Sequence, residues 1–221
     1  MHLRMVVLLS GGGTTLQNLI DRIGRGELPA RVEGVISSRT DAFGLERARR
    51  HGIPAVAVPR RAYPDDGSFN EALWREIEGF GPDLVVLGGF MSLLRVPAAY
   101  QLRIVNVHPA LIPSFCGKGM YGHHVHEAVL AYGAKITGAT VHFVDEQYDH
   151  GPIIIQRACP VLEDDTAETL AERVQAVERE IYPLAIRWIA EGRVRVEGRR
   201  VRIVGDGAQG PVSGERAADF V

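Results

Sequence analysis

Cysteine is scarce in this sequence: Cys116 and Cys159 are the two cysteines in 221 residues. They stand far apart, and no Cys-x-x-Cys spacing of a metal site or redox pair is present. Isolated thiols are typical of proteins from reducing compartments, where disulfides do not persist. We therefore expect two free thiols in a cytoplasmic protein, with no metal centre.

Long hydrophobic runs and an excess of one charge are also lacking. The formal net charge is −2, which does not indicate a nucleic-acid or membrane surface. The apolar run at 3–9 is far too short to span a bilayer. It leads into a glycine turn instead of a small-residue cleavage site, so we interpret it as a buried strand. No repeat, low-complexity block or linker occurs, which predicts one domain over 1–205 and a flexible tail at 206–221.

Short apolar strands alternate with amphipathic helices through the first half of the chain. The expected strands are 3–9, 32–38, 54–59, 82–90 and 103–108, and the expected helices follow Thr14 and cover 41–52 and 69–80. Continuously apolar strands are buried on both faces, so the pattern predicts an α/β fold with an open, mostly parallel sheet. Two further strands, 138–146 and 151–161, have a short connection, which indicates an antiparallel C-terminal part.

The last third of the chain predicts a long helix and a hairpin. Asp165 and Glu168 have the spacing of a capping box, and an apolar stripe at helical spacing follows them. Pro183 is expected to kink or end this helix. Residues 193–204 are expected to form a small hairpin that turns at Glu197 and Gly198.

A glycine loop, "SGGGTT" at 10–15, joins the first strand to the first helix. Glycines let the backbone approach a ligand, and a helix N-terminus offers free N–H groups to an anion. Leu16 breaks the dinucleotide fingerprint, and the lysine of a P-loop is missing. The loop favours a single phosphate monoester, although a tight turn that packs the helix on the strand is the alternative.

Asn106 and His108 stand two residues apart at the expected carboxyl end of a strand, so their side chains share one face. An amide that stabilises an oxyanion and an imidazole that carries a proton suit acyl transfer through a tetrahedral intermediate. Pro109 and Pro113 restrict the segment behind them. Asp149, between the two late strands, is the best candidate to support a charged histidine. Such an Asn-x-His pair also occurs for structural reasons alone.

The remaining histidines do not predict a metal site. His123, His124 and His126 lie together at the start of an expected helix, where we interpret them as a surface cluster, and His142 is expected to lie in the core or behind the site. No serine or cysteine stands in a nucleophile elbow, which disfavours a covalent hydrolase.

Several motifs resemble those of the glycinamide ribonucleotide formyltransferase family, in order from about residue 3 to about residue 196. They are "SGGGTTLQ", "DAFGLERAR..GIP", "LVVLGGFMSLL", "NVHPALIPSF", "TVHFVDEQYDHGPIIIQ" and "ERVQAVEREIYP". The resemblance implies a Rossmann-like formyltransferase fold. It also implies direct attack of the amine of 5′-phosphoribosylglycinamide on the formyl group of 10-formyltetrahydrofolate, in purine synthesis and without a metal.

The resemblance also implies roles for individual residues. Asn106 would bind the formyl oxygen, His108 would be the acid and Asp149 would raise its pKa. The ribonucleotide would be bound by Gly13, Thr14, Thr15, Gln175 and Glu178. The folate would be bound by Asn106, by Met91, Ser92, Leu93 and Leu94, and by Asp145, Glu146, Gln147, Tyr148 and Asp149. The partners would be small molecules, with no nucleic acid or membrane, and the protein a monomer or homodimer.

The sequence departs from the family pattern at three places. Ser92 and Asp66 stand where the family often has arginine, and "CGKGMYGHH" at 116–124 replaces a shorter connection. These departures affect the outer folate contacts and leave the three catalytic candidates in place.

Three alternatives remain open. A hydrolase that removes formyl from the same folate usually carries an additional N-terminal domain, whereas the glycine strand here begins almost at Met1. Transfer to another amine acceptor, such as methionyl-tRNA, is associated with an added C-terminal domain and a basic surface. A nucleotide- or folate-binding module without activity would reuse the fold.

Overall fold

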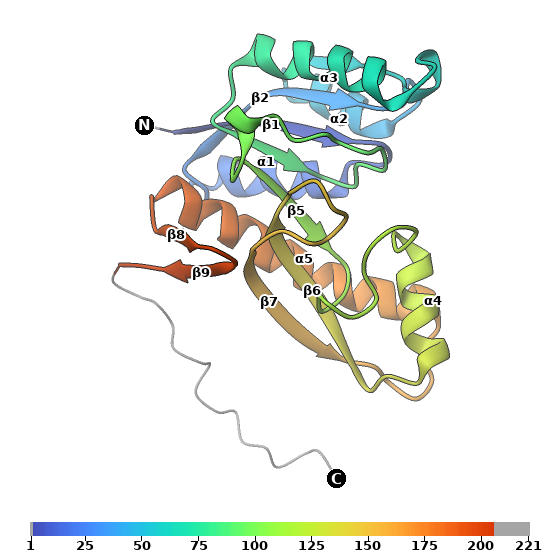
Figure 1. The fold of residues 1–221 in the computed structure, drawn as a ribbon. Coiled ribbons are helices and arrows are strands. Elements are labelled where there is room, and N and C mark those ends of the chain that lie inside the picture. The colour runs from blue at the N-terminus through green and yellow to red at the C-terminus, as the bar shows by residue number, and fades with distance from the viewer. Residues whose placement is uncertain (1, 206–221) are drawn as a thin grey trace.

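A seven-stranded sheet forms the centre of the computed structural model, which describes residues 2–205 (Figure 1). The strand order is β3-β2-β1-β4-β5-β6-β7. The strands are β1 Leu3–Leu9, β2 Ala30–Ser37, β3 Ala55–Ala57, β4 Leu84–Leu87, β5 Ile104–His108, β6 Ile136–Phe143 and β7 Ile153–Pro160. The helices are α1 Thr14–Gly24, α2 Phe43–Arg50, α3 Asp66–Phe80, α4 His123–Tyr132 and α5 Ala167–Ala190, with 3-10 turns η1 Arg60–Ala62 and η2 Ala98–Tyr100. The predicted tail at 206–221 lies outside the described residues.

The direction of the strands confirms the predicted mixture. β1 to β5 pair in parallel, β6 runs antiparallel to β5, and β7 runs antiparallel to β6. The chain builds outward from β1 to β3 and then returns to place β4 on the other side of β1. Ligands of open α/β sheets bind at such a switch point, beyond the carboxyl ends of the strands. The expected hairpin is also present, as β8 Val194–Glu197 paired with β9 Arg200–Ile203.

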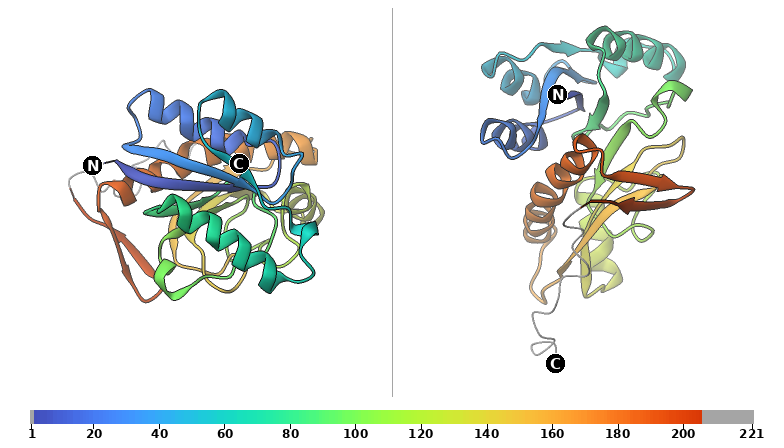
Figure 2. Two further views of the ribbon diagram at one scale, coloured as in Figure 1. Left: turned by 90° about the horizontal axis from the view of Figure 1, so that it is seen from above. Right: turned by 90° about the vertical axis from the view of Figure 1, so that its left-hand side faces the viewer.

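Both faces of the sheet are covered, which explains why its strands lack polar alternation. Met5, Val7 and Leu9 of β1 pack in the core formed with α1, α2 and α5. Val6 and Leu8 point the other way, into the core formed with α3 and η2. Seen from above, α1 and α2 lie on one side of the sheet and α3 lies on the other (Figure 2). This burial holds the carboxyl ends of β1, β4 and β5 in fixed positions.

Helix α5 corrects two expectations. It runs without interruption past Pro183. Proline leaves the carbonyl of the residue four positions earlier without its helical donor, and here that carbonyl, of Arg179, accepts a 3.0 Å hydrogen bond from the Asn18 amide of α1. The capping box consists of Thr166 and Thr169 instead of Asp165 and Glu168. Contacts between helices, which local spacing does not reveal, account for the continuous helix.

The turn that brings β6 and β7 together requires glycine at 151. A Cβ atom there would overlap the carbonyl oxygen of Phe143. We expect Gly151→Ala to destabilise the protein by about 1–3 kcal/mol, which lowers the melting temperature by roughly 2–4 °C per kcal/mol in a chain of this size. Gly79→Ala is the matched control, because Gly79 lies inside α3 with open space at its Cβ position. Differential scanning calorimetry measures both, and equal melting temperatures for the two variants would contradict the close approach.

Candidate active site

A cavity of about 670 Å³ lies beyond the carboxyl ends of β1, β4 and β5. Every residue that the sequence analysis assigned to catalysis or binding contributes to its wall. These residues are Gly13, Thr14, Thr15, Met91, Ser92, Leu93, Leu94, Asn106, His108, Asp145, Glu146, Gln147, Tyr148, Asp149, Gln175 and Glu178. Segments that are far apart in the sequence therefore share one site, large enough for two ligands of metabolite size.

The glycine loop ends in the conformation that an anion site needs. Gly13 precedes α1 with φ 72°, and a Cβ atom there would lie 2.7 Å from the Cα atom of Gly44. Both facts demand glycine, since a side chain would be strained and would push α2 away. No side chain caps the first turn of α1. The N–H groups of this turn, from Thr14 onward, thus remain for a ligand anion.

Ser10 joins this loop to the loop after β4. Its N–H donates to the carbonyl of Gly89 at 3.0 Å, and its hydroxyl accepts from the N–H of Met91 at 2.9 Å. The same hydroxyl pairs with Ser38 of the β2–α2 connection at 2.6 Å, and both serines are buried. The loops predicted for phosphate and for folate are therefore connected directly, a role of Ser10 that sequence spacing did not show.

The antiparallel pairing of β5 with β6 places His142 opposite Asn106. His142 Nδ1 lies 2.8 Å from its neighbour's carbonyl, that of Phe143, and therefore donates to it. Its other nitrogen, Nε2, then accepts from the Asn106 amide at 3.3 Å. This contact directs the NH₂ group of Asn106 toward His142 and leaves a second N–H for the cavity. His142 is buried behind the site, as expected.

Thr140 holds the segment that follows His108. Its hydroxyl donates to the carbonyl of Ala110 at 2.7 Å and accepts the N–H of Ile112 at 3.1 Å and the amide of Gln156 at 2.9 Å. Thr140 stands opposite His108 in the β5–β6 pairing and is fully buried. The stiffness expected from Pro109 and Pro113 is thus reinforced by a cross-strand side chain.

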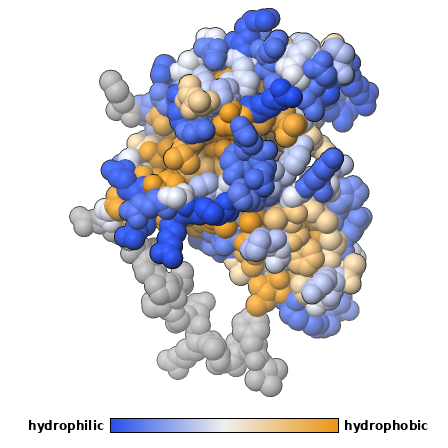
Figure 3. Space-filling model, viewed as in Figure 1, coloured by the Kyte–Doolittle hydropathy of each residue, from blue (hydrophilic) through white to orange (hydrophobic). Residues whose placement is uncertain are grey.

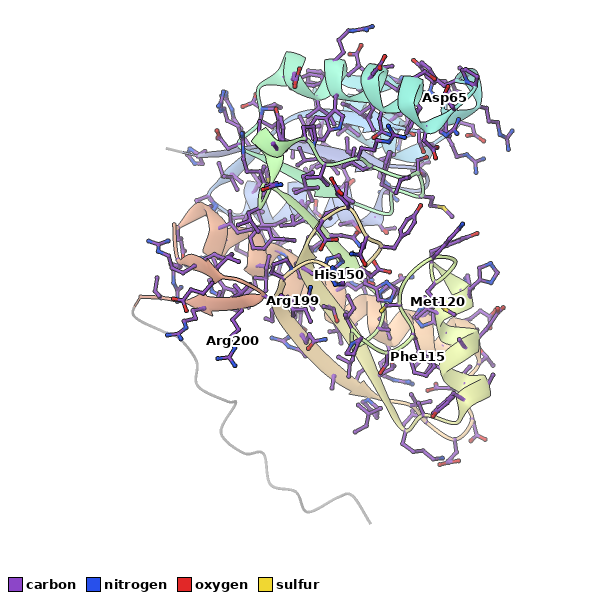
Figure 4. The ribbon with its side chains drawn as sticks, in the orientation of Figure 1. Asp65, Phe115, Met120, His150, Arg199 and Arg200 are labelled. Carbon is purple, nitrogen blue, oxygen red and sulfur yellow. The ribbon has the colours of Figure 1, made fainter. Side chains whose placement is uncertain are left out.

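Both ring nitrogens of His108 face oxygen atoms. Nε2 donates to the carbonyl of Phe115 at 2.8 Å, and Nδ1 lies 3.4 Å from Oδ2 of Asp149. Phe115, labelled in Figure 4, belongs to the loop that leads into α4. Burial lowers the pKa of His108, while the Asp149 carboxylate and the Phe115 carbonyl oppose this. The ring becomes a better base when negative charge develops on a ligand oxygen beside it.

Asp149 is held as a carboxylate. Burial alone would raise its pKa, but His142, His108 and the Gly117 amide outweigh burial and lower the pKa. The N–H of Gly117 donates to Oδ2 at 2.9 Å. His142 Nε2 lies 3.7 Å from Oδ1 and supports the carboxylate only when the His142 ring is protonated. The backbone of Asp149 has φ 53°, a left-handed conformation that aspartate tolerates better than most residues. The geometry keeps one negative charge beside His108.

Helix α5 supplies the wall near the glycine loop. Gln175 and Glu178 face the cavity from this helix. Burial raises the pKa of Glu178 to about 7, and the nearby Arg179 opposes this shift. One turn later, the buried Tyr182 hydroxyl lies 2.9 Å from the carbonyls of both Leu87 and Val105, which fixes β4 against β5.

His126 corrects the interpretation of the histidine cluster. Only 3% of it is exposed, it lines the cavity, and its Nδ1 atom is buried without a hydrogen-bond partner. His124 remains exposed, as expected, and His123 lies at the cavity wall. The i, i+3 spacing of His123 and His126 on one helix face could have indicated this.

The walls predicted for folate are the 91–94 segment and the loop at 145–149. Met91 is 62% exposed and Tyr148 49%, whereas Leu94 is buried. Hydrophilic side chains cover the loop between β6 and β7 at the middle of the face in Figure 3. At the departures from the family pattern, Ser92 lines the cavity and Asp66 pairs with Arg60 at 2.8 Å.

Three features bear on other classes of function. Among residues 2–205, no group of three or more His, Cys, Asp or Glu side chains could hold a metal ion. Cys116 and Cys159 are both free. Within the same residues, no helix has the length and apolar character needed to cross a membrane.

Comparisons with known proteins agree with this geometry. The formyl transferase family model matches residues 3–186. The phosphoribosylglycinamide formyltransferase of Escherichia coli is 39% identical over 88% of this chain and 90% of its own. The crystal structure of glycinamide ribonucleotide transformylase 1 from Symbiobacterium toebii is 48% identical, with a TM-score of 0.87 over 92% of this chain and 95% of that one. A formyltetrahydrofolate deformylase from Pseudomonas syringae is 27% identical, with a TM-score of 0.83, and this chain covers 67% of it.

Burial of His108 and His126 predicts acid sensitivity. Burial lowers the pKa of both rings, so the unfolded chain takes up their protons first as the pH falls below about 6.5. The stability contributed by the two neutral rings is then complete above that pH and is lost as the pH falls toward the pKa of the rings in the folded protein.

We expect His126→Gln to weaken this pH dependence of the unfolding free energy by up to about 1.4 kcal/mol per pH unit. Urea unfolding at pH 7.5, 6.5 and 5.5 measures it, with His124→Gln as the exposed control that keeps the wild-type slope. An unchanged slope in His126→Gln would show that the ring is not held neutral.

Proposed function

This chain belongs to the formyl transferase family, and we propose that it transfers the formyl group of 10-formyltetrahydrofolate to the amine of 5′-phosphoribosylglycinamide, a step of purine biosynthesis. The observation that supports this most is the convergence of Asn106, His108 and Asp149 with the uncapped N-terminus of α1 in one cavity. The phosphate of the ribonucleotide would lie on Gly13, Thr14 and Thr15, and Gln175 and Glu178 would contact the rest of it. We further expect a cytoplasmic protein, monomeric or homodimeric.

The amine nitrogen attacks the formyl carbon, and the formyl oxygen becomes an oxyanion. The free N–H of Asn106 stabilises this charge, which is largest in the tetrahedral intermediate. The Nε2–H of His108, which meets the Phe115 carbonyl when no substrate is bound, would turn to the same oxygen. Asp149 supports the positive charge on His108 while the intermediate exists. The attacking nitrogen loses a proton and N10 of the folate gains one, so the intermediate collapses to formylated ribonucleotide and tetrahydrofolate. The residues Met91 to Leu94 and Asp145 to Asp149 would hold the folate.

The overall reaction is tested with both substrates. We expect formylated ribonucleotide and tetrahydrofolate to appear in equal amounts, because amine attack is the only route by which the formyl group leaves. Chromatographic detection of the formylated product and absorbance of released folate follow the two channels. Folate release without ribonucleotide would identify a hydrolase, and binding without turnover would identify a binding module or another acceptor.

The three catalytic assignments are tested by substitution. We expect His108→Ala and Asp149→Asn each to lower kcat by roughly 10²–10⁴, the usual loss for an acid–base group. Asn106→Ala is expected to lose about 10²–10³, as for an oxyanion donor. His124→Ala is the matched control, because His124 is exposed and lies outside the cavity wall. Calorimetric titration with the ribonucleotide should show binding in all variants, and near-normal kcat in the His108 or Asp149 variant would refute its role.

A further inference from the structure

Lysine is the rare cation of this chain. The sequence has 25 lysine and arginine residues, of which Lys118 and Lys135 are the only lysines. Lys135 pairs with Glu163 at 2.8 Å, at the start of β6. Lys118 is exposed, lines the cavity and forms no salt bridge with any residue in the described part of the chain. A side chain with this much freedom keeps its charge available for a ligand.

The charges around Lys118 are mostly of the opposite sign. The carboxylates of Asp145, Glu146 and Asp149 line the cavity, and no arginine of residues 2–205 lines it. Arg60, outside the lining, is already paired with Asp66. Lys118 is therefore the one permanently charged cation that the described part of the wall presents to an anionic ligand. Acidic walls alone would repel such a ligand.

We propose that Lys118 binds the carboxylates of the folate's glutamate tail and so favours folates with several glutamates over those with one. The inference rests on the proposed function, which makes a folate the co-substrate. A folate ends in p-aminobenzoylglutamate, and each further glutamate adds one carboxylate. The tail must leave the cavity past its mouth, where the mobile four-carbon stem of a lysine can follow carboxylates at different positions.

The ribonucleotide phosphate is a poorer match for Lys118. It already has a site in the glycine loop, where the uncapped N–H groups of α1 supply a partial positive charge. Lys118 instead lies next to Gly117, whose N–H holds Asp149 of the predicted folate loop at 2.9 Å. Met120, labelled in Figure 4, lies on the same connection to α4 and also lines the cavity. The position of Lys118 is thus tied to the folate side of the cavity.

The arrangement also connects tail binding to the catalytic carboxylate. Gly117 and Gly119, on either side of Lys118, have positive φ values of 96° and 90°, conformations that glycine adopts without strain. A tail carboxylate that holds Lys118 restrains this connection and with it the Gly117 N–H on Asp149. The glutamate tail then contributes to preorganisation of the site as well as to affinity.

Protection of the two lysines from acetylation tests the contact without any turnover. The wild-type protein is treated with limiting acetic anhydride, and modification of each lysine is quantified by peptide mass spectrometry. The ligands are tetrahydrofolate triglutamate, tetrahydrofolate monoglutamate and glycinamide ribonucleotide, with saturation confirmed by calorimetry. We expect the triglutamate to slow acetylation of Lys118 by at least about threefold, the monoglutamate less, and Lys135 to be unaffected.

Other results of the acetylation experiment would contradict either this inference or the proposed function. Bound triglutamate that leaves Lys118 unprotected overturns this inference and leaves the proposed function standing. Protection by the ribonucleotide alone, at least as strong as that by the triglutamate, assigns Lys118 to the phosphate and also overturns it. A protein that binds no folate at all refutes the proposed function, and this inference with it.

Steady-state kinetics provide the second test, with 10-formyltetrahydrofolate mono- and triglutamate as substrates. An exposed ion pair gives about a three- to fivefold preference in KM, which we expect in the wild-type protein, in Lys118→Arg and in the control Lys135→Gln. In Lys118→Gln the preference should fall to about one, with the KM for the ribonucleotide unchanged. High salt should reduce the wild-type preference, because it screens exposed charges. An undiminished preference in Lys118→Gln would contradict the assignment.

Discussion

The buried carboxylate of Asp149 holds the separate parts of this site together. It meets His108 from β5, His142 from β6 and the N–H of Gly117 from the loop before α4. A largely buried charge is costly unless donors and positive charge stabilise it, which favours this arrangement of the three elements. The position of every proposed catalytic group therefore depends on one ion and its partners.

The sheet explains how two substrates can meet at this carboxylate. β1 and β4 are neighbours at the switch point, and the glycine loop that follows β1 and the 88–94 segment that follows β4 both line the cavity. Ser10 connects the two loops, and Tyr182 bonds to a carbonyl of β4 and to one of β5. The antiparallel addition of β6 and β7 then brings the 145–149 loop back over β5. The parallel part of the sheet provides most of the cavity, and the antiparallel part completes its wall with the Asp149 carboxylate.

The sequence predicted most of the fold, since apolar strands, helical stripes and glycine turns are local signals. The mixed sheet, the hairpin and the placement of all proposed site residues around one cavity agree with it.

Contacts between distant segments were not predictable from spacing. Pro183 sits inside an unbroken helix because Asn18 of α1 bonds to the freed carbonyl. His126 is buried because its face of α4 turns toward the cavity, and the roles of Ser10 and Thr140 exist only after the loops have folded around them. The extent of the domain and the roles of the site residues stay predictions.

The most direct test of the proposed site is a crystal structure with glycinamide ribonucleotide and tetrahydrofolate bound together. We expect the phosphate on the N–H groups of residues 13–15. We also expect the amine nitrogen and N10 of the folate to meet beside Asn106 and His108, with the amine within about 3.5 Å of the position of the formyl carbon, as near-attack geometry requires. A phosphate bound elsewhere, or an amine on the side of the cavity away from Asn106, would contradict the proposed site.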